Sequence, residues 1–74
     1  MRITDPVSFG AAIKKRRKEL GYTQKELADY CGCSTVFLSQ LENGKETAEL
    51  GRALTIIATL GIDLTAFKRT GGEL

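Results

Sequence analysis

The sequence predicts an all-α fold, a compact domain of four short helices followed by a short C-terminal β-strand. Apolar residues recur at helical spacing in four segments, and capping residues or glycines stand at the ends of those segments. The 74 residues make one small domain, for which a second subunit would supply further buried apolar surface. We expect an N-terminal arm at residues 1–6, the helical domain at 7–61, a strand at 62–69 and a flexible tail at 70–74.

The first helix is predicted to run from Val7 to Leu20. Phe9, Ile13 and Leu20 fall on one face, and Gly21 follows where a C-terminal cap belongs. Arg17 lies on that same inward face, and a cation placed there needs a partner. We predict a structural ion pair between Arg17 and Glu42, with phosphate contact as the alternative role of Arg17.

The second and third helices form the most informative part of the chain. Thr23 and Glu26 have the spacing of a capping box, Gly32 ends the helix that they begin, and Ser34 caps a third helix that runs to about Glu42. Two short helices joined by a glycine turn make a helix-turn-helix. The second helix of such a pair can enter the major groove of DNA.

The fourth helix is predicted to begin with a cap at Thr47 and to end at Gly61. Its apolar residues form two adjacent seams that cover more of the helix than one core requires: Leu50, Leu54 and Ile57, and Ala53, Ile56 and Leu60. A fully buried central helix is one interpretation. A face shared between the core and a partner subunit is the one we favour.

The segment after Gly61 alternates apolar and polar residues from Ile62 to Ala66, a strand pattern, with Phe67 out of phase. A fifth short helix is the alternative. An isolated strand cannot satisfy its backbone groups, so it would need the same strand of a symmetry mate. We therefore expect the interface of a homodimer to include apolar residues of both segments: Ile56, Leu60, Ile62, Leu64 and Phe67.

Short neutral side chains face outward from the third helix, and we expect four residues to contact bases: Ser34, Thr35, Val36 and Gln40. The amide of Gln40 matches the N6 and N7 edge of adenine, and the Thr or Val methyls can touch the thymine methyl, so we expect A·T steps. We also expect phosphate contacts around this face. Gln24 would make one at the start of the second helix, Asn43 and Lys45 would make others after the third helix, and Phe37 would lie at the edge.

Charge and composition favour a DNA-binding protein without cofactor or metal. Residues 1–45 carry eight Lys or Arg and five acidic residues, whereas residues 46–74 carry three and four. Cys31 and Cys33 are too few for a zinc site without histidine and too close for an easy disulfide. Without histidine or a phosphate-binding glycine loop, an enzyme is not expected. No apolar run reaches membrane-span length, so we expect a bacterial cytoplasmic protein associated with the nucleoid.

The chain resembles the Cro/C1, or XRE-like, family of helix-turn-helix proteins over residues 9–60. The matching residues are Arg17, Thr23, Gln24, Glu26, Leu27, Ala28, Gly32, Ser34, Leu38, Gln40, Leu41, Glu42, Asn43, Gly44 and Lys45. The resemblance implies base contacts at positions 34 to 36 and 40, phosphate contacts near Gln24, Asn43 and Lys45, and the buried Arg17–Glu42 pair.

The C-terminal third departs from the usual repressor pattern, because it has no proline-bearing loop and no evident fifth helix. In this respect the chain is most similar to HipB-type antitoxins. That resemblance implies a homodimer with paired C-terminal strands, an inverted-repeat operator in its own promoter, and a HipA-like kinase toxin as partner. The alternatives are a free-standing phage-type or chromosomal regulator without a toxin, and a protein-interaction module that has lost DNA binding.

Overall fold

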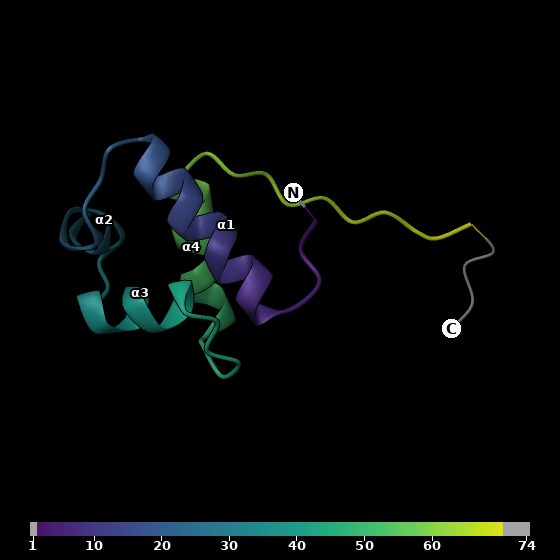
Figure 1. Cartoon of the computed structure of the whole chain (residues 1–74), viewed down its shortest axis with the longest axis horizontal. Helices are drawn as coiled ribbons and strands as arrows, with labels where there is room; N and C mark the ends of the chain where they lie inside the picture. Colours follow the sequence, from purple (N-terminus) through teal and green to yellow (C-terminus); the bar gives the residue numbers. More distant parts are fainter. Residues whose placement is uncertain (1, 71–74) are drawn as a thin grey trace.

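Four helices make up the fold in this computed structural model, which describes residues 2–70 (Figure 1). They are α1 (Pro6–Glu19), α2 (Gln24–Cys31), α3 (Thr35–Glu42) and α4 (Leu50–Thr59). α3 packs against both α1 and α2, and α4 packs against α2. The predicted all-α, four-helix fold is confirmed.

Side-chain caps fix the starts of the first three helices. The Asp5 carboxylate accepts the Ser8 backbone N–H at 2.7 Å, so α1 begins at Pro6, one residue before the predicted start. The predicted capping box of α2 is present: Thr23 Oγ1 accepts from the Glu26 N–H at 3.1 Å, and Glu26 Oε1 accepts from the Thr23 N–H at 2.9 Å. Ser34 caps α3 as predicted.

The core lies where all four helices meet. Each helix contributes at least one of the largest fully buried side chains, and α4 contributes two if its C-cap residue is included: Ile13, Leu27, Leu38, Ile56 and Leu60. Helical spacing predicted the inward direction of Ile13 correctly and that of Phe9 in part, but Leu20, expected on the same face, is 42% exposed at the end of α1.

The predicted cap of α4 at Thr47 is wrong. Thr47 lies in a turn, α4 starts at Leu50, and its N-cap residue Glu49 makes no side-chain capping hydrogen bond. The packing of Ala53, Ile56 and Ile57 into the core fixes this helix instead. Burial of an apolar face outweighs a local capping preference when the two compete.

Two of the five residues expected at the dimer interface belong to the core of the single chain. Ile56 and Leu60 are each 1% exposed, so they offer almost no surface to a partner, and their assignment to the interface is wrong. The outward apolar residues of α4 are instead Leu50, 67% exposed, and Leu54, 41% exposed. Spacing identified the two seams on α4, but it could not tell that one seam, together with Ile57 of the other, faces the core.

The segment from Ile62 to Arg69 extends away from the helices as an arm and forms neither a strand nor a fifth helix within residues 2–70 (Figure 1). The strand prediction is not borne out because a strand needs a neighbour for its backbone groups, and no described segment lies beside this one in a ladder. Residues 71–74 of the predicted tail lie outside the described part of the chain.

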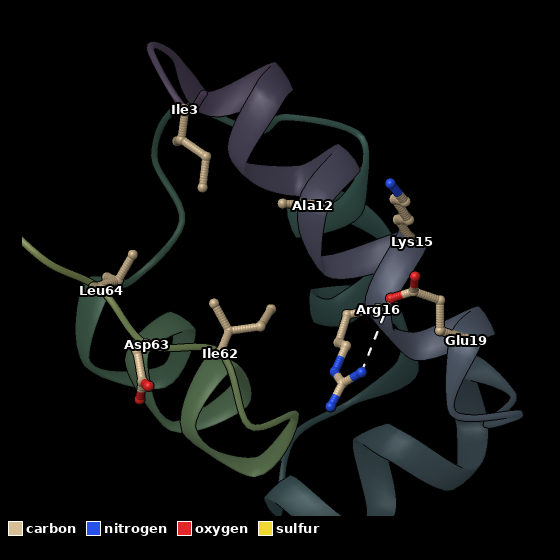
Figure 2. Close-up of a pocket in the computed structure, with 8 residues that line it drawn as sticks. All are labelled: Ile3, Ala12, Lys15, Arg16, Glu19, Ile62, Asp63 and Leu64. Carbon is tan, nitrogen blue, oxygen red and sulfur yellow. Dashed lines mark ion pairs between the residues drawn. The ribbon is translucent and has the colours of Figure 1, made fainter. Parts of the chain in front are cut away.

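The base of this arm is attached to the helices by two hydrogen bonds. The Ile62 N–H donates to the Ile57 carbonyl at 2.9 Å, and Arg16 Nε of α1 donates to the Leu60 carbonyl at 2.9 Å. Figure 2 shows Arg16 and Ile3 facing Ile62 and Leu64 across a pocket at this base. The arm therefore leaves the domain from a fixed point at the end of α4.

Candidate nucleic-acid interface

α2 and α3 are joined by a short turn whose backbone is fully defined by local hydrogen bonds. Gly32 has φ +68°, a left-handed conformation that favours glycine, and the following Cys33 N–H donates to the Ala28 carbonyl at 3.0 Å. Ser34 Oγ then accepts the Phe37 N–H at 3.0 Å and begins α3. With Leu38 and Leu41 buried, α3 is held in a fixed orientation across α2.

The outward face of α3 carries all four residues predicted to contact bases. Ser34, Thr35, Val36 and Gln40 are exposed, while Ser39 is half-buried. Positions 36 and 40 are one helical turn apart and therefore share a face. These four side chains are exposed and uncharged, so they can meet base edges by hydrogen bonds and methyl contacts.

Arg17 and Glu42 form the predicted ion pair. Arg17 Nε lies 2.7 Å from Glu42 Oε2, and Arg17 Nη2 donates to Glu42 Oε1 at 3.0 Å. Both side chains are buried, and the third guanidinium nitrogen, Nη1, donates to the Tyr22 carbonyl at 2.8 Å. The hydrogen bond to Glu42 raises the pKa of Arg17 against the opposing effect of desolvation. This pair fixes the end of α3 to α1.

Gln24 joins the same network, which the sequence did not predict. Its Nε2 donates to Glu42 Oε1 at 3.1 Å, and the side chain is half-buried. A phosphate contact by this amide would use its second N–H. Nothing local in the sequence signals the link, because residues 24 and 42 meet only when α2 and α3 cross.

The end of α3 brings Gln40 and Lys45 together. Gly44 has φ +84°, and the Lys45 N–H turns back to donate to the Gln40 carbonyl at 3.0 Å. Lys45 Nζ also donates to Gln40 Oε1 at 3.1 Å. Lys45, Gln40 and Asn43 are all exposed. Gln40 and Lys45, predicted to have separate roles, are thus in direct contact.

Phe37 and Arg52 form the flank of α3 that faces α4. Phe37 is half-buried against the core, and the Arg52 guanidinium lies 5.9 Å from its ring centroid. Arg52 also pairs with Glu49, with 3.0 Å between Nε and Oε2. Sequence reasoning missed Arg52, although it is the only cation in the α4 segment.

The two cysteines and the possibility of a metal site were also compared with the structure. Cys31 and Cys33 are free and half-buried, and burial raises the pKa of Cys33, so its thiol stays protonated at neutral pH. Among residues 2–70 no three His, Cys, Asp or Glu side chains gather as a metal site. No helix in this range is long and apolar enough to cross a membrane.

Known proteins share this sequence pattern over most of the chain. A family model described as helix-turn-helix matches residues 13–67. The uncharacterized HTH-type transcriptional regulator y4mF of Sinorhizobium fredii is 42% identical over 67 residues, which cover 88% of each chain. The ImmF control region 10 kDa protein of Bacillus phage phi105 is 35% identical over 66 residues, covering 89% of this chain and 73% of the phage protein.

Solved structures show the same fold. A chain of the HipA-HipB-O2-O3 complex and one of the HipB-O4 20mer complex each have a TM-score of 0.83 and 28% identity to this protein. Each match covers 92% of this chain and 96% of the other. The shared motif, the exposed face of α3 and these relatives together show that the chain belongs to the Cro/C1, XRE-like helix-turn-helix family of DNA-binding transcriptional regulators, with a HipB-like structure.

Proposed function

We propose that this protein is a homodimeric, sequence-specific repressor that acts as an antitoxin, regulating its own operon and binding a HipA-like kinase toxin. The observation that carries the proposal is the likeness to HipB, at a TM-score of 0.83 over 92% of this chain. The names of those structures pair HipB with HipA, with O2-O3 and with an O4 20mer. The absence of a fifth helix from the described residues agrees with this likeness.

DNA recognition is assigned to the outward face of α3. Thr35, Val36 and Gln40 would meet base edges in the major groove, with Ser34 at the start of the helix. Gln24 at the start of α2 and Asn43 and Lys45 after α3 would hold phosphates at either end, with Phe37 at the edge. Arg52, which lies beside Phe37, adds a cation at this edge of α3.

The dimer is assigned to the arm. Leu64 and Phe67 are 53% and 87% exposed, and Ile62 is half-buried at the base of the arm. Among residues 2–70, the backbone groups of residues 63–69 make no hydrogen bond with one another or with the helices. Pairing with the arm of a second copy would satisfy those groups and cover these apolar side chains.

A rigid dimer places two recognition helices about 34 Å apart, one turn of B-DNA, so the operator should be an inverted repeat. We expect that inserting five base pairs between its half-sites moves them to opposite faces of the duplex and lowers the affinity at least tenfold. Fluorescence anisotropy with the native and lengthened duplexes measures this. A ten-base-pair insertion, which restores the phase, is the control. Equal affinity for all three duplexes would mean that the helices do not bind as a pair.

The toxin partner is tested by co-purification. The protein carrying an N-terminal affinity tag is isolated from its native host, and its companions are identified by mass spectrometry. A stoichiometric companion with kinase sequence motifs supports the antitoxin function, and adding it should change the affinity of the protein for its promoter. Repeated isolation of the protein alone would reject the toxin partner while leaving DNA binding intact.

A regulator without a toxin is the second candidate, and the 35% identity to the ImmF control region protein of phage phi105 favours it. The neighbouring reading frame separates the two functions. A kinase-like frame adjoining this gene supports the antitoxin, whereas phage-type genes on both sides support the free-standing regulator.

A further inference from the structure

We propose that Lys45 is a positioning residue for Gln40, which fixes the direction of the Gln40 amide and thereby sets the base specificity of α3. The inference rests on the proposed function, because it assumes that Gln40 meets a base. It assigns to Lys45 a second role beside the proposed phosphate contact. The observation that carries it is the hydrogen bond of 3.1 Å from Lys45 Nζ to Gln40 Oε1.

The backbone turn after α3 places Lys45 beside Gln40, so the two side chains start from neighbouring positions. After α3 the chain turns at Gly44, whose φ of +84° allows Lys45 to fold back. The Lys45 N–H then donates to the Gln40 carbonyl at 3.0 Å, and the Gly44 N–H donates to the Leu41 carbonyl at 3.1 Å. This hydrogen-bonded turn anchors the Lys45 backbone beside Gln40.

Chemistry then determines which end of the amide faces Lys45. A lysine ammonium carries three donors and no acceptor, so it can bind only the oxygen of the carboxamide. Oε1 of Gln40 therefore points toward Lys45, and the two hydrogens of Nε2 point away from it. One lone pair of Oε1 remains free, because a carbonyl oxygen can accept two hydrogen bonds.

A fixed amide presents its acceptor and its donor to the DNA in one order only. Adenine offers a donor at N6 and an acceptor at N7, which match Oε1 and Nε2 in that order. Guanine offers two acceptors, O6 and N7, so one of them would face the Oε1 lone pair. An amide that is free to rotate could adapt to either purine. Lys45 thus makes Gln40 select adenine over guanine.

The test compares base preferences between variants that change one side chain each. The probe is the half-site duplex that the wild-type protein selects from a random library, together with all its single-base-pair variants. The proteins are wild type, Gln40→Ala, Lys45→Met, and Lys25→Met as the control. Lys25 is also exposed, but it pairs with Asp29 at 3.3 Å on α2 and does not contact Gln40.

We expect Gln40→Ala to abolish the preference at one base pair and Lys45→Met to reduce the preference at that same pair about fivefold, the effect of one net hydrogen bond. Lys45→Met should have no further effect on this preference in the Gln40→Ala background. It should also weaken binding to every duplex through the lost phosphate contact. Lys25→Met should leave every preference unchanged.

The alternative results are distinguishable. If Gln40→Ala flattens one position and Lys45→Met only weakens all duplexes alike, the positioning role of Lys45 is wrong and the proposed base contact stands. If Gln40→Ala changes no preference, the assignment of a base contact to Gln40 is wrong, and so is the positioning role of Lys45. If no duplex is selected, the proposed DNA recognition fails.

A measurement without DNA gives a second readout. In the free protein, the ¹⁵N side-chain amide signals of Gln40 should shift in Lys45→Met and not in Lys25→Met, while the backbone spectrum elsewhere stays the same. Unchanged Gln40 amide signals in Lys45→Met would overturn the proposal.

Discussion

At the scale of single residues, the most consequential contacts are those of the buried Arg17–Glu42 pair. Burying two charges costs several kcal/mol, which is offset only when each charged atom has a partner. Here Arg17 reaches Glu42 and the Tyr22 carbonyl, and Gln24 adds a further donor to Glu42. Within residues 2–70 no buried side-chain nitrogen or oxygen lacks a hydrogen bond. The pair therefore joins α1, α2 and α3 where α3 ends.

Arg17→Ala should lower the free energy of unfolding by about 3 kcal/mol, because it leaves the Glu42 carboxylate buried without its counter-charge. Urea denaturation at pH 7 measures the change. Lys18→Ala, which removes an exposed cation next in sequence, is the control and should change stability little. An unchanged unfolding midpoint for Arg17→Ala would contradict the structural role of the pair.

The Glu26 carboxylate in the capping box of α2 gives stability a defined pH dependence. Hydrogen bonds from the Thr23 backbone and side chain lower the pKa of Glu26 in the folded protein. A lowered folded-state pKa means that the contribution is complete above the ordinary glutamate value of about 4.3 and is lost as pH falls through the lowered value.

The wild-type protein should therefore lose more stability between pH 5 and pH 3 than Glu26→Gln, which cannot titrate at this position. Urea midpoints measured across this pH range test the difference. Glu46→Gln, at an exposed glutamate outside the helix caps, should follow the wild-type curve. Parallel curves for wild type and Glu26→Gln would reject the contribution of the capping box.

At the scale of helices, close approach between α1 and α3 positions the recognition helix. Gly10 of α1 is buried against the end of α3, where an added methyl group would collide with the Leu41 carbonyl and come within 2.6 Å of the Glu42 carbonyl. Backbone atoms cannot move aside as a flexible side chain can. Gly10 therefore sets the distance between α1 and α3.

Gly10→Ala should destabilise the protein by about 2 kcal/mol, in the range of overpacked cores. Gly51→Ala is a matched control in α4, because its methyl group would meet only the end of the Glu49 side chain. It should stabilise the protein by up to about 1 kcal/mol through helix propensity. Thermal and urea unfolding of both variants measure the opposite signs. Stabilisation by Gly10→Ala as well would show that helix propensity, rather than the contact with α3, controls position 10.

At the scale of the whole molecule, the arm stands apart from the helical domain, because residues 63–69 are all exposed. The helical domain buries its own core, and the arm extends from the end of α4 (Figure 1). Its apolar residues Leu64 and Phe67 are exposed. A domain this small buries a small fraction of its surface on folding, so its stability is marginal. A dimer joined through the arms would add the buried area that the single chain lacks.

Leu64→Lys combined with Phe67→Lys should shift the protein from dimer to monomer without unfolding the helices, because both side chains are exposed in the single chain. Sedimentation equilibrium gives the mass, and circular dichroism gives the helix content. Thr65→Lys combined with Thr70→Lys adds the same charge at exposed polar positions and should leave the dimer intact. A dimer that survives the first pair of changes would place the interface elsewhere, with Leu50 and Leu54 as the next candidates.

The sequence by itself determined the features that are encoded locally. The capping box at Thr23 and Glu26, the turn at Gly32 and the cap at Ser34 each involve residues close together in the sequence. Their types and spacing therefore predict the helix-turn-helix. The Arg17–Glu42 pair was also predictable, because a cation on an apolar face requires a partner and the family resemblance implies Glu42 as that partner.

Tertiary structure decided everything that depends on which elements meet. Only packing shows that Ile56 and Leu60 belong to the core and Leu50 and Leu54 to the surface, because both seams of α4 are equally apolar in sequence. Only the folded end of α3 brings Lys45 onto Gln40. The arm forms no strand within residues 2–70, since a strand is completed by hydrogen bonds to a neighbouring segment and no described segment lies beside it.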